Sequence, residues 1–382
     1  MTTDVLFYVQ HLLGVGHVKR AAALCRGGFE RAGLRVSVVL GGPAVDLADF
    51  GDAEIVQLPT AWAADTGFSA IFDEDGEPID DAWRAGRRDR LLALYERTRP
   101  SVLLIELFPF GRRQFRFELL PLLETARGQA RIVCSVRDVL VTKDKPERNR
   151  EVADTVNRYF DRVFVHGDPT VVPFDATFPE TERIRDRIAY TGYVAEREGG
   201  GSGGLKAAGE VIVSTGGGAV GENLMRTALA ARRAGHLVEY PWRMLPGGNL
   251  DPAVFDDLRD QAPDGVIVER ARPDFRKLLD GAALSISQGG YNTVMDVLAA
   301  GCPALVVPFA DGSESEQTFR ARKFERRGLL HVLDEAVMTP ERLGRSAAAA
   351  ITAPQAAHDF DMSGVETTAR LVASMIEEGE GP

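Results

Sequence analysis

The sequence of 382 residues has only three cysteines, no long hydrophobic run and fewer basic than acidic residues. Cys25, Cys134 and Cys302 lie far apart in apolar surroundings, so we expect reduced thiols in a cytosolic protein and neither disulfides nor a metal site. No stretch approaches the roughly 20 apolar residues of a membrane-spanning helix. The start, Met1 to Asp4, lacks the basic region of a signal peptide. We therefore expect a cytoplasmic protein, with peripheral contact at the inner membrane face left open.

Charge and length narrow the class of protein further. The formal net charge is −11, whereas nucleic-acid-binding proteins carry a basic face, so we expect no nucleic-acid partner. A content of 45% hydrophobic and 26% charged residues is typical of a globular protein. At this length the chain should form two domains of about 150–200 residues.

The first half opens with the pattern strand, glycine loop, helix. An apolar strand, Val5 to Val9, runs into a loop that contains Gly14 and Gly16, and an alanine-rich helix follows. This is how a doubly wound α/β unit begins. The third glycine of the dinucleotide fingerprint is absent, so NAD binding is not expected. His17 lies where the helix starts, which makes it a candidate general base; the alternative is that it caps the helix or bonds the backbone.

Polar residues recur where later strands of the first half should end. The apolar strand 101–106 ends at Glu106 and runs into a loop with Arg112, and the strand 131–136 is followed by Arg137 and Asp138. Carboxyl ends of parallel strands meet at one edge of a sheet, where α/β proteins keep their ligands. We therefore predict a polar cleft there. Interior ion pairs or a solvated rim are the alternative.

The predicted boundary between the domains is rich in glycine. Residues 199–204 read Gly-Gly-Gly-Ser-Gly-Gly, which is typical of a flexible linker. We predict an acceptor-side domain over 1–194, a linker over 195–208 and a nucleotide-binding domain over 209–360. The last segment, 361–382, carries apolar residues at helical spacing and is expected to be a helix that docks back on the first domain.

The second half repeats the strand, glycine loop and helix pattern twice. The strand 210–214 is followed by the loop that contains Gly216, Gly217 and Gly218, and another strand is predicted near 238–240. Farther along, the strand 284–287 runs through Gln288, Gly289 and Gly290 into a helix that Gly301 ends.

The second of these helices offers an anion site at its start. Asn292 or Thr293 is predicted to cap it, and Asp296 lies one turn deeper. A helix N-terminus behind a glycine turn presents N–H groups and the positive end of the helix dipole, which suits a phosphate. The alternative is a strand–helix joint whose glycines only permit close packing.

The motifs 214–218, 287–290 with Asp296, 300–303 and 307–317 together resemble the carboxy-terminal domain of GT-B glycosyltransferases. The likeness is to family 28, which includes the enzymes that add N-acetylglucosamine to the lipid-linked peptidoglycan precursor. The first half is similar to a bacterial branch of predicted glycosyltransferases through Gly14-x-Gly16-His17, Glu106 to Arg112 and Arg137-Asp138. The resemblance implies two Rossmann-like doubly wound α/β domains that face a cleft.

The resemblance also implies roles for particular residues. The donor would be a nucleotide diphosphate sugar, UDP-linked, whose diphosphate lies on the two glycine turns, beside Gln288, Asn292 and Thr293. Arg270 and Ala271 would face the base, Asp296 the ribose, and Glu316 and Gln317 the sugar. The relatives usually have Glu at the ribose position, one methylene longer than Asp296.

The expected activity is metal-independent transfer of the sugar, with inversion, to a hydroxyl of a glycan, lipid-linked or small-molecule acceptor, without a cofactor. His17 would be the base, with Glu106 and Asp138 in reserve, and the acceptor side would use Gly14, Gly16, Arg20, Arg112 and Arg137. Two hypotheses remain open beside it. A hydrolase or epimerase of nucleotide sugars is indicated by the likeness of 14–20 to a hydrolase of the pseudaminic acid pathway, and a non-catalytic nucleotide-sugar sensor would need only the second half.

Overall fold

The computed structural model consists of two compact units. Unit 1 comprises Met1–Val194 and Asp361–Pro382, and unit 2 comprises Ala195–Phe360. The structure describes residues 3–12, 14–45, 48–64, 70–140, 145–195, 209–216, 221–248, 250–272, 274–309, 316–354, 356–357 and 359–379.

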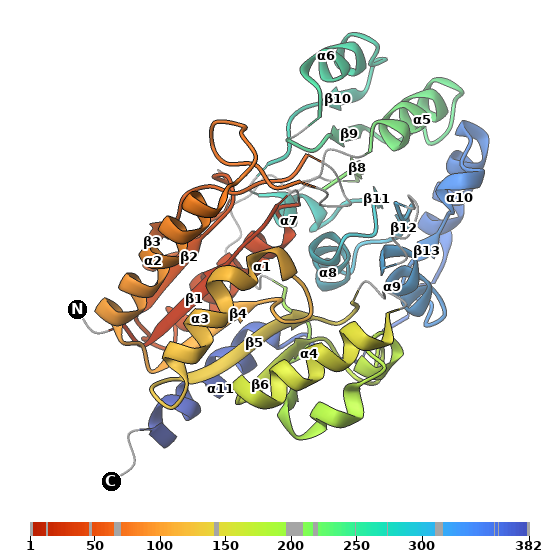
Figure 1. The fold of residues 1–382 in the computed structure, drawn as a ribbon. Coiled ribbons are helices and arrows are strands. Elements are labelled where there is room, and N and C mark those ends of the chain that lie inside the picture. Colours follow the sequence, from red (N-terminus) through yellow and green to blue (C-terminus); the bar gives the residue numbers. More distant parts are fainter. Residues whose placement is uncertain are drawn as a thin grey trace. The chain divides into compact units, whose positions relative to one another are not determined.

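Unit 1 is built on a parallel sheet of seven strands in the order β3-β2-β1-β4-β5-β6-β7 (Figure 1). The strands are β1 (Val5–Val9), β2 (Val36–Leu40), β3 (Glu54–Gln57), β4 (Val102–Glu106), β5 (Arg131–Arg137), β6 (Arg162–His166) and β7 (Ile188–Tyr190). The helices are α1 (Gly16–Leu24), which a π-helical turn at Cys25–Phe29 extends, α2 (Asp81–Thr98), α3 (Arg116–Ala126), α4 (Pro146–Tyr159) and α11 (Gly364–Gly379).

Helices cover both faces of this sheet because its central strands are apolar on both sides. In β1, Leu6 and Tyr8 belong to the core that α2, α3 and α4 complete, through residues such as Leu91 and Leu119. The alternate residue Phe7 meets Phe29 edge to face, with ring centroids 6.4 Å apart. The strand order reverses between β1 and β4, and such a switch point is where doubly wound proteins bind ligands.

Unit 2 repeats this plan with a parallel sheet of six strands in the order β10-β9-β8-β11-β12-β13. The strands are β8 (Val211–Ser214), β9 (Trp242–Leu245), β10 (Val266–Val268), β11 (Leu284–Ser287), β12 (Ala304–Val306) and β13 (His331–Val332). The helices are α5 (Glu222–Arg233), α6 (Pro252–Asp260), α7 (Phe275–Leu279), α8 (Tyr291–Ala300), α9 (Glu316–Glu325) and α10 (Pro340–Thr352). Here the strand order reverses between β8 and β11.

The prediction of Rossmann-like α/β domains is confirmed in both units, but one predicted strand is wrong. Residues 238–240 form no strand, and β9 begins two residues later at Trp242. The apolar residues before Pro241 lie in a turn, where Tyr240 N donates to Leu237 O and Leu237 has a left-handed φ of 50°.

Helix α11 belongs to unit 1 although it follows unit 2 in the chain. Figure 1 draws it in blue beside β4 and β5, which it contacts. Its start is fixed by two backbone bonds, Tyr193 N to Asp361 O (2.8 Å) and Gly364 N to Tyr193 O (3.0 Å). A Cβ on Gly28 would come within 2.8 Å of Val365 O, so a glycine is needed where the turn after α1 meets α11.

A buried ionic group holds α2 and α3 to the first glycine loop. Arg87 on α2 donates to Glu118 on α3 (Nε to Oε2, 2.9 Å) and to Gln10 Oε1 (2.5 Å). Tyr8 donates to the other carboxylate oxygen of Glu118 (2.5 Å). Arg87, Glu118 and Gln10 are fully buried. Because Gln10 opens the loop that leads to α1, this group also sets where that loop starts.

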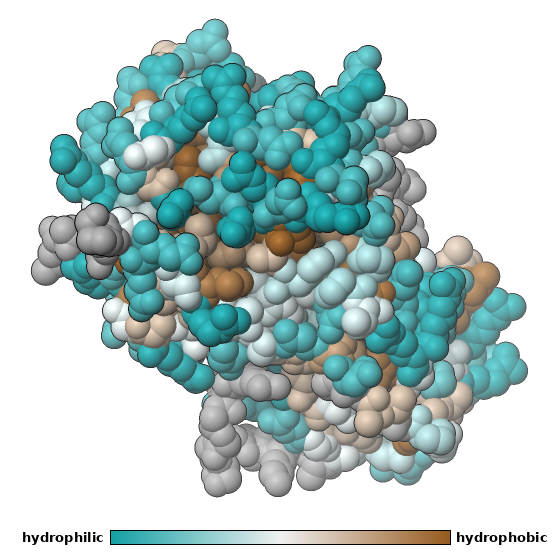
Figure 2. Space-filling model, turned by 90° about the horizontal axis from the view of Figure 1, so that it is seen from below, coloured by the Kyte–Doolittle hydropathy of each residue, from teal (hydrophilic) through white to brown (hydrophobic). Residues whose placement is uncertain are grey.

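The outer surface is mostly polar. Hydrophilic residues cover most of the face in Figure 2, with hydrophobic residues between them. The large hydrophobic side chains exposed in the described part of the chain are Ile55, Val238, Ile267 and Val337, which come from four separate segments. None of the described helices has the length and apolar content to cross a bilayer.

Replacing Arg87 should destabilise unit 1 strongly. Arg87→Ala leaves the Glu118 carboxylate buried without its counter-ion, and we expect the free energy of unfolding to fall by about 3–5 kcal/mol. Arg84→Ala is the matched control on the same helix, because Arg84 forms an exposed ion pair with Asp81 that contributes about 0–1 kcal/mol. Urea denaturation followed by circular dichroism measures both variants. A loss for Arg87→Ala no larger than for the control would contradict the assignment.

Candidate functional site

The polar residues predicted at strand ends of unit 1 meet at the carboxyl edge of its sheet. The loop after β1 leads to His17 in the first turn of α1, and Glu106 is the last residue of β4. Since β1 and β4 are hydrogen-bonded neighbours, the parallel register brings these two segments together from positions 89 residues apart. The site therefore lies at the switch point of unit 1.

His17 and Arg20 converge on the carboxylate of Glu106. His17 Nδ1 lies 2.9 Å from Glu106 Oε1, and Arg20 donates to the same oxygen. The side chain of His17 is 13% exposed, that of Arg20 2%, and that of Glu106 is fully buried. Among these three groups, only the imidazole can therefore meet a substrate.

A chain of hydrogen bonds continues from Glu106 across β5 and β6. Ser135 Oγ donates to Glu106 Oε2 (2.5 Å) and lies 2.9 Å from His166 Nε2, while His166 Nδ1 lies 2.8 Å from Thr191 Oγ1. Because the single hydroxyl proton of Ser135 goes to the carboxylate, Ser135 accepts from His166 Nε2–H. His166 Nδ1 then accepts from Thr191. One arrangement of protons satisfies the whole chain.

Burial sets the charges in this group. Burial and the nearby charge of Arg112 lower the pKa of His17 to about 3, so its imidazole is neutral near pH 7. Burial alone would raise the pKa of Glu106, but the charge of Arg20 and hydrogen bonds from His17 and Ser135 outweigh it and keep the carboxylate ionised. His17 Nδ1 lies 3.3 Å from Arg20 Nη2 and 2.9 Å from Glu106 Oε1, and the closer, ionised carboxylate favours a proton on Nδ1. The lone pair is then on Nε2, which has no hydrogen-bond partner among the described residues.

The other residues predicted for the acceptor side lie around this edge in different settings. Gly14 and Gly16 are exposed. Arg112 is half-buried with a left-handed φ of 59°, and its Nε donates to Gln10 O (2.6 Å). Arg137 is half-buried at the end of β5. Asp138 is fully buried and accepts from the backbone N–H of Val139 at 2.8 Å.

In unit 2, the turns after β8 and β11 flank the switch point. Ser214 and Ser287 are register partners at the ends of these strands, and Gln288 N donates to Ser214 O (3.3 Å). A Cβ on Gly216 would lie 3.7 Å from Thr293 Oγ1, so the first turn reaches the start of α8. The predicted Gly217 and Gly218 lie outside the described residues.

The predicted cap of α8 is wrong. The N-cap is Gly290, and no side chain bonds the first turn of the helix as a cap. Asn292 and Thr293 already lie inside the helix, because Gly290 takes the extended conformation of an N-cap and Tyr291 begins the helix. The first-turn N–H groups of a helix have no intrahelical acceptors, and a glycine N-cap has no side chain of its own to accept from them.

The remaining donor-side residues lie on segments next to α8. Asp296 is half-buried one turn along the helix. A Cβ on Gly289 would come within 3.2 Å of Gln317 Cβ, so the turn after β11 packs against the start of α9. Gln317 Oε1 accepts from Phe309 N (3.1 Å), and Glu316 is buried in an ion pair with Arg320 (2.7 Å). These contacts gather segments from β11, β12 and α9.

Arg270 and Ala271 follow β10, at the edge of the sheet beyond β9. Arg270 donates to Leu250 O (3.2 Å) and stacks over the ring of Phe255 at 4.1 Å. Both predicted residues are half-buried. They therefore lie two strands away from the turn after β8.

Several polar residues of the two sites were missed by sequence reasoning. Ser135 lies inside a strand that was expected to be core. His166 ends β6 among the polar strand ends but was given no role, and His11 is buried with its Nδ1 unbonded among described residues. Ser214, Ser285 and Ser287 are also buried without a side-chain partner in the described part of the chain. The available signal was a polar residue in an otherwise apolar strand. Among the described residues, no three His, Cys, Asp or Glu side chains are grouped so that they could hold a metal ion.

Unit 1 should lose stability as the pH falls below about 6.5. Burial lowers the pKa of His11 to about 4 and the pKa values of His17 and His166 to about 3, so the unfolded chain binds more protons than the native one between these values and 6.5. The lowered pKa of Glu106 acts in the same direction at lower pH. Between pH 7.5 and 5.0 each histidine should remove roughly 2 kcal/mol. Urea denaturation at the two pH values measures this, His166→Gln should reduce the difference, and equal stability at both would contradict it.

A family model matches part of the second half of the chain. Residues 257–370 match the glycosyltransferase family 28 C-terminal domain. A UDP-N-acetylglucosamine–N-acetylmuramyl-(pentapeptide) pyrophosphoryl-undecaprenol N-acetylglucosamine transferase of Geobacillus kaustophilus is 28% identical over 178 residues, 44% of this chain and 48% of the relative. The chain thus spans about half the length of the curated relatives it matches.

Solved structures resemble the whole chain. The calicheamicin glycosyltransferase has a TM-score of 0.59 and 19% identity, over 100% of this chain and 96% of its own. A spinosyn rhamnosyltransferase in complex with thymidine diphosphate has a TM-score of 0.60 and 18% identity, over 98% and 96%. At such identities the likeness shows the fold alone. Residues 257–370 thus match a family 28 glycosyltransferase domain, and the fold of the chain is similar to that of solved GT-B glycosyltransferases.

Proposed function

We propose that the chain transfers a sugar from a nucleotide diphosphate sugar, UDP-linked, to a hydroxyl acceptor, with inversion and without a metal ion or cofactor. The observation that carries the proposal is the contact of 2.9 Å between the neutral imidazole of His17 and the ionised carboxylate of Glu106. A neutral imidazole has a lone pair that can accept a hydroxyl proton, and the hydrogen bond and charge of Glu106 raise its basicity against the effect of burial.

His17 is the catalytic base in this proposal. Its Nε2 takes the proton of the acceptor hydroxyl, whose oxygen bonds to the anomeric carbon as the bond from that carbon to the diphosphate oxygen breaks. The electron pair of the broken bond leaves with the nucleotide diphosphate. The imidazolium that forms is stabilised by Glu106 through Nδ1–H. Glu106 and Asp138 are fully buried, so Glu106 acts as a positioning residue and neither carboxylate is the base.

The donor diphosphate is assigned to the turns of unit 2. Gly216, Gly289 and Gly290 place no side chain of their own at the first turn of α8, and the N–H groups and dipole of that turn can stabilise the departing anion without a metal ion. Asp296 is assigned to the ribose hydroxyls, Glu316 and Gln317 to the sugar, and Arg270 with Ala271 to the base, as the resemblance implies. Pairing with Arg320 fixes the Glu316 carboxylate for that role.

The choice of donor base and acceptor rests on likeness. The curated relative is named for a UDP-linked donor and an undecaprenol-linked acceptor, and a structural neighbour was solved with thymidine diphosphate. We propose UDP for this chain, used in the cytoplasm or at the inner membrane face. Arg112 and Arg137 suit an anionic acceptor, because burial lowers the pKa of Arg112 only to about 10 and leaves it cationic. Arg20, which is buried against Glu106, orients the carboxylate.

Removing the base should abolish turnover and spare donor binding. His17→Ala is expected to lower kcat by about 10²–10⁴-fold, the usual contribution of a general base, while the Kd for the donor stays within about threefold of wild type. Release of nucleotide diphosphate with a screened acceptor measures turnover. Unchanged turnover would exclude His17 as the base. Sugar released without an acceptor would indicate a hydrolase.

Removing the ribose contact should weaken donor binding. A thermal-shift screen identifies the nucleotide sugar that most stabilises the wild type, since a bound ligand raises apparent stability by mass action. Asp296→Ala should then raise the Kd for this donor roughly 10–100-fold, as expected when charge-assisted hydrogen bonds of about 1.5–3 kcal/mol are lost. Asp260→Ala, an exposed carboxylate on α6, is the matched control. Equal affinity of the two variants would remove Asp296 from the site.

A further inference from the structure

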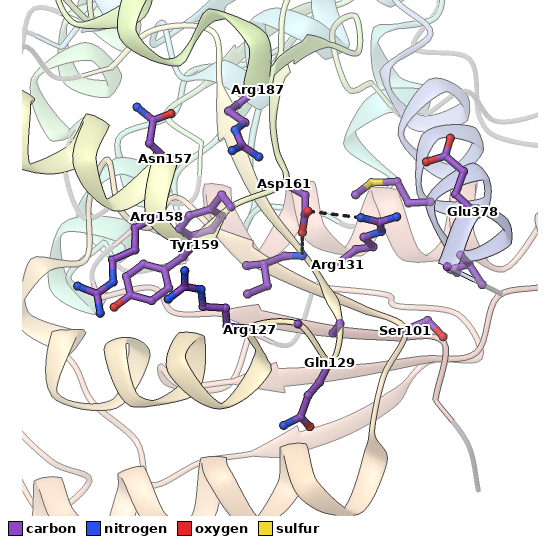
Figure 3. A pocket seen from close by; sticks show the side chains of 17 residues that line it. Ser101, Arg127, Gln129, Arg131, Asn157, Arg158, Tyr159, Asp161, Arg187 and Glu378 are labelled. Atoms are coloured by element: carbon purple, nitrogen blue, oxygen red, sulfur yellow. Dashed lines mark hydrogen bonds and ion pairs between the residues drawn. The ribbon is translucent and has the colours of Figure 1, made fainter. Parts of the chain in front are cut away.

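A second pocket lies at the opposite, amino edge of the unit 1 sheet. It is lined by the residue before β4, the turns that precede β5 and β6, Arg187 before β7, and the end of α11 (Figure 3). Its volume is about 540 Å³, which is within the range of small-molecule sites, about 300–1,000 Å³. None of the residues assigned above to the transfer reaction lines it.

The pocket is basic although the chain is acidic. Arg127, Arg131, Arg158 and Arg187 line it, against the two carboxylates of Asp161 and Glu378. Glu124 pairs with Arg158 from outside the lining, so four guanidinium groups meet three carboxylates, a local excess of one positive charge in a chain with a net charge of −11. A smaller adjoining hollow of about 330 Å³ shares Asn157 and Arg187 and adds three arginines and two carboxylates, Glu182 and Asp186. A concave surface of one sign concentrates ions of the opposite sign.

Two of the four guanidinium groups have no carboxylate partner. Arg158 pairs with Glu124 (2.6 Å) and Arg131 with Asp161 (3.6 Å). Neither Arg127 nor Arg187 forms an ion pair with a described residue, whereas surface arginines elsewhere, such as Arg35 and Arg226, do. The two guanidinium groups outside these ion pairs thus come from separate turns, and Arg127 lies close enough to Glu124 to lower the pKa of that carboxyl.

The rest of the lining fits a ligand that is part anion and part apolar. Met375 and Ile376 of α11 are half-buried and give the pocket an apolar wall. Gln129 and Ser101 add neutral hydrogen-bonding side chains, and Figure 3 shows both among the labelled residues around the cavity. The planar guanidinium fork matches the oxygens of phosphate better than an ammonium group does.

We infer that this pocket binds the phosphate group of an ester, with Arg127 and Arg187 as its principal ligands and the apolar wall against the rest of the molecule. The site is separate from the transfer site, since β5 runs from Arg131 at the pocket to Arg137 at the other edge, about 20 Å at 3.3 Å per residue. The phosphate group belongs either to a soluble metabolite or to a lipid head group.

The test compares two double variants of the full chain with the same change in charge. Arg127→Gln/Arg187→Gln alters the pocket, and Arg84→Gln/Arg88→Gln alters exposed arginines on α2 as the matched control. Phenyl phosphate binding is measured by calorimetry, and binding to vesicles of phosphatidic acid in phosphatidylcholine by sedimentation against phosphatidylcholine alone. Salt at about 0.15 M limits non-specific attraction. Phosphate bound at the unit 2 turns is common to all variants and cancels in the comparison.

We expect Arg127→Gln/Arg187→Gln to raise the Kd for phenyl phosphate or for phosphatidic acid vesicles at least tenfold, which corresponds to about 1.4 kcal/mol. The Kd of the control variant should stay within twofold of wild type. A loss confined to phenyl phosphate identifies a soluble ester as the ligand. A loss confined to phosphatidic acid vesicles identifies a lipid head group. Equal binding by both double variants in both arms, or no binding by the wild type in either arm, overturns the inference.

Discussion

The buried carboxylate of Glu106 is the constraint on which the rest of unit 1 depends. An ionised group without contact with water must be compensated from within, because its desolvation costs several kcal/mol. Arg20 supplies the opposite charge, and His17 and Ser135 supply hydrogen bonds. These partners come from α1 and β5, so neutralising one charge fixes one helix and two strands at the carboxyl edge. The same compensation leaves His17 Nε2, a proton acceptor, with no partner among described residues.

The two units use one topology for different chemistry. Both sheets reverse their strand order beside the first strand, and both place a glycine turn at that point. Unit 1 fills its switch point with titratable side chains whose charges cancel. Unit 2 places small hydroxyls, glycines and a helix start without a side-chain cap there. Glycosyl transfer requires a base that accepts the proton of the acceptor hydroxyl and a site that binds the leaving diphosphate. The proposed function assigns the base to unit 1 and the diphosphate site to unit 2.

The sequence predicted what local pattern determines. Apolar runs located β1, β2, β4, β5 and β11 to within a residue or two, and Gly301 ended α8 with the expected left-handed φ of 62°. The failures were the strand near 238–240 and the cap of α8. In both cases several adjacent residues have similar propensities, and the local pattern does not determine at which of them the strand or the helix begins. Long-range partners could not be predicted at all. Glu118 accepts from Tyr8 across 110 residues, and nothing in either segment identifies the other.

The contrast between the two edges of the unit 1 sheet follows from the same electrostatic rule. At the carboxyl edge the charges of Arg20 and Glu106 lie in the interior, where an uncompensated charge would be costly, and each is the counter-charge of the other. At the amino edge Arg127 and Arg187 reach solvent, where a guanidinium without a partner costs little. An unpaired charge therefore persists there without destabilising the fold. This charge contributes to stability only when an anion binds in the pocket and displaces water. Binding of a ligand therefore stabilises the amino edge, whereas the buried carboxylate at the carboxyl edge is neutralised by groups of the chain itself.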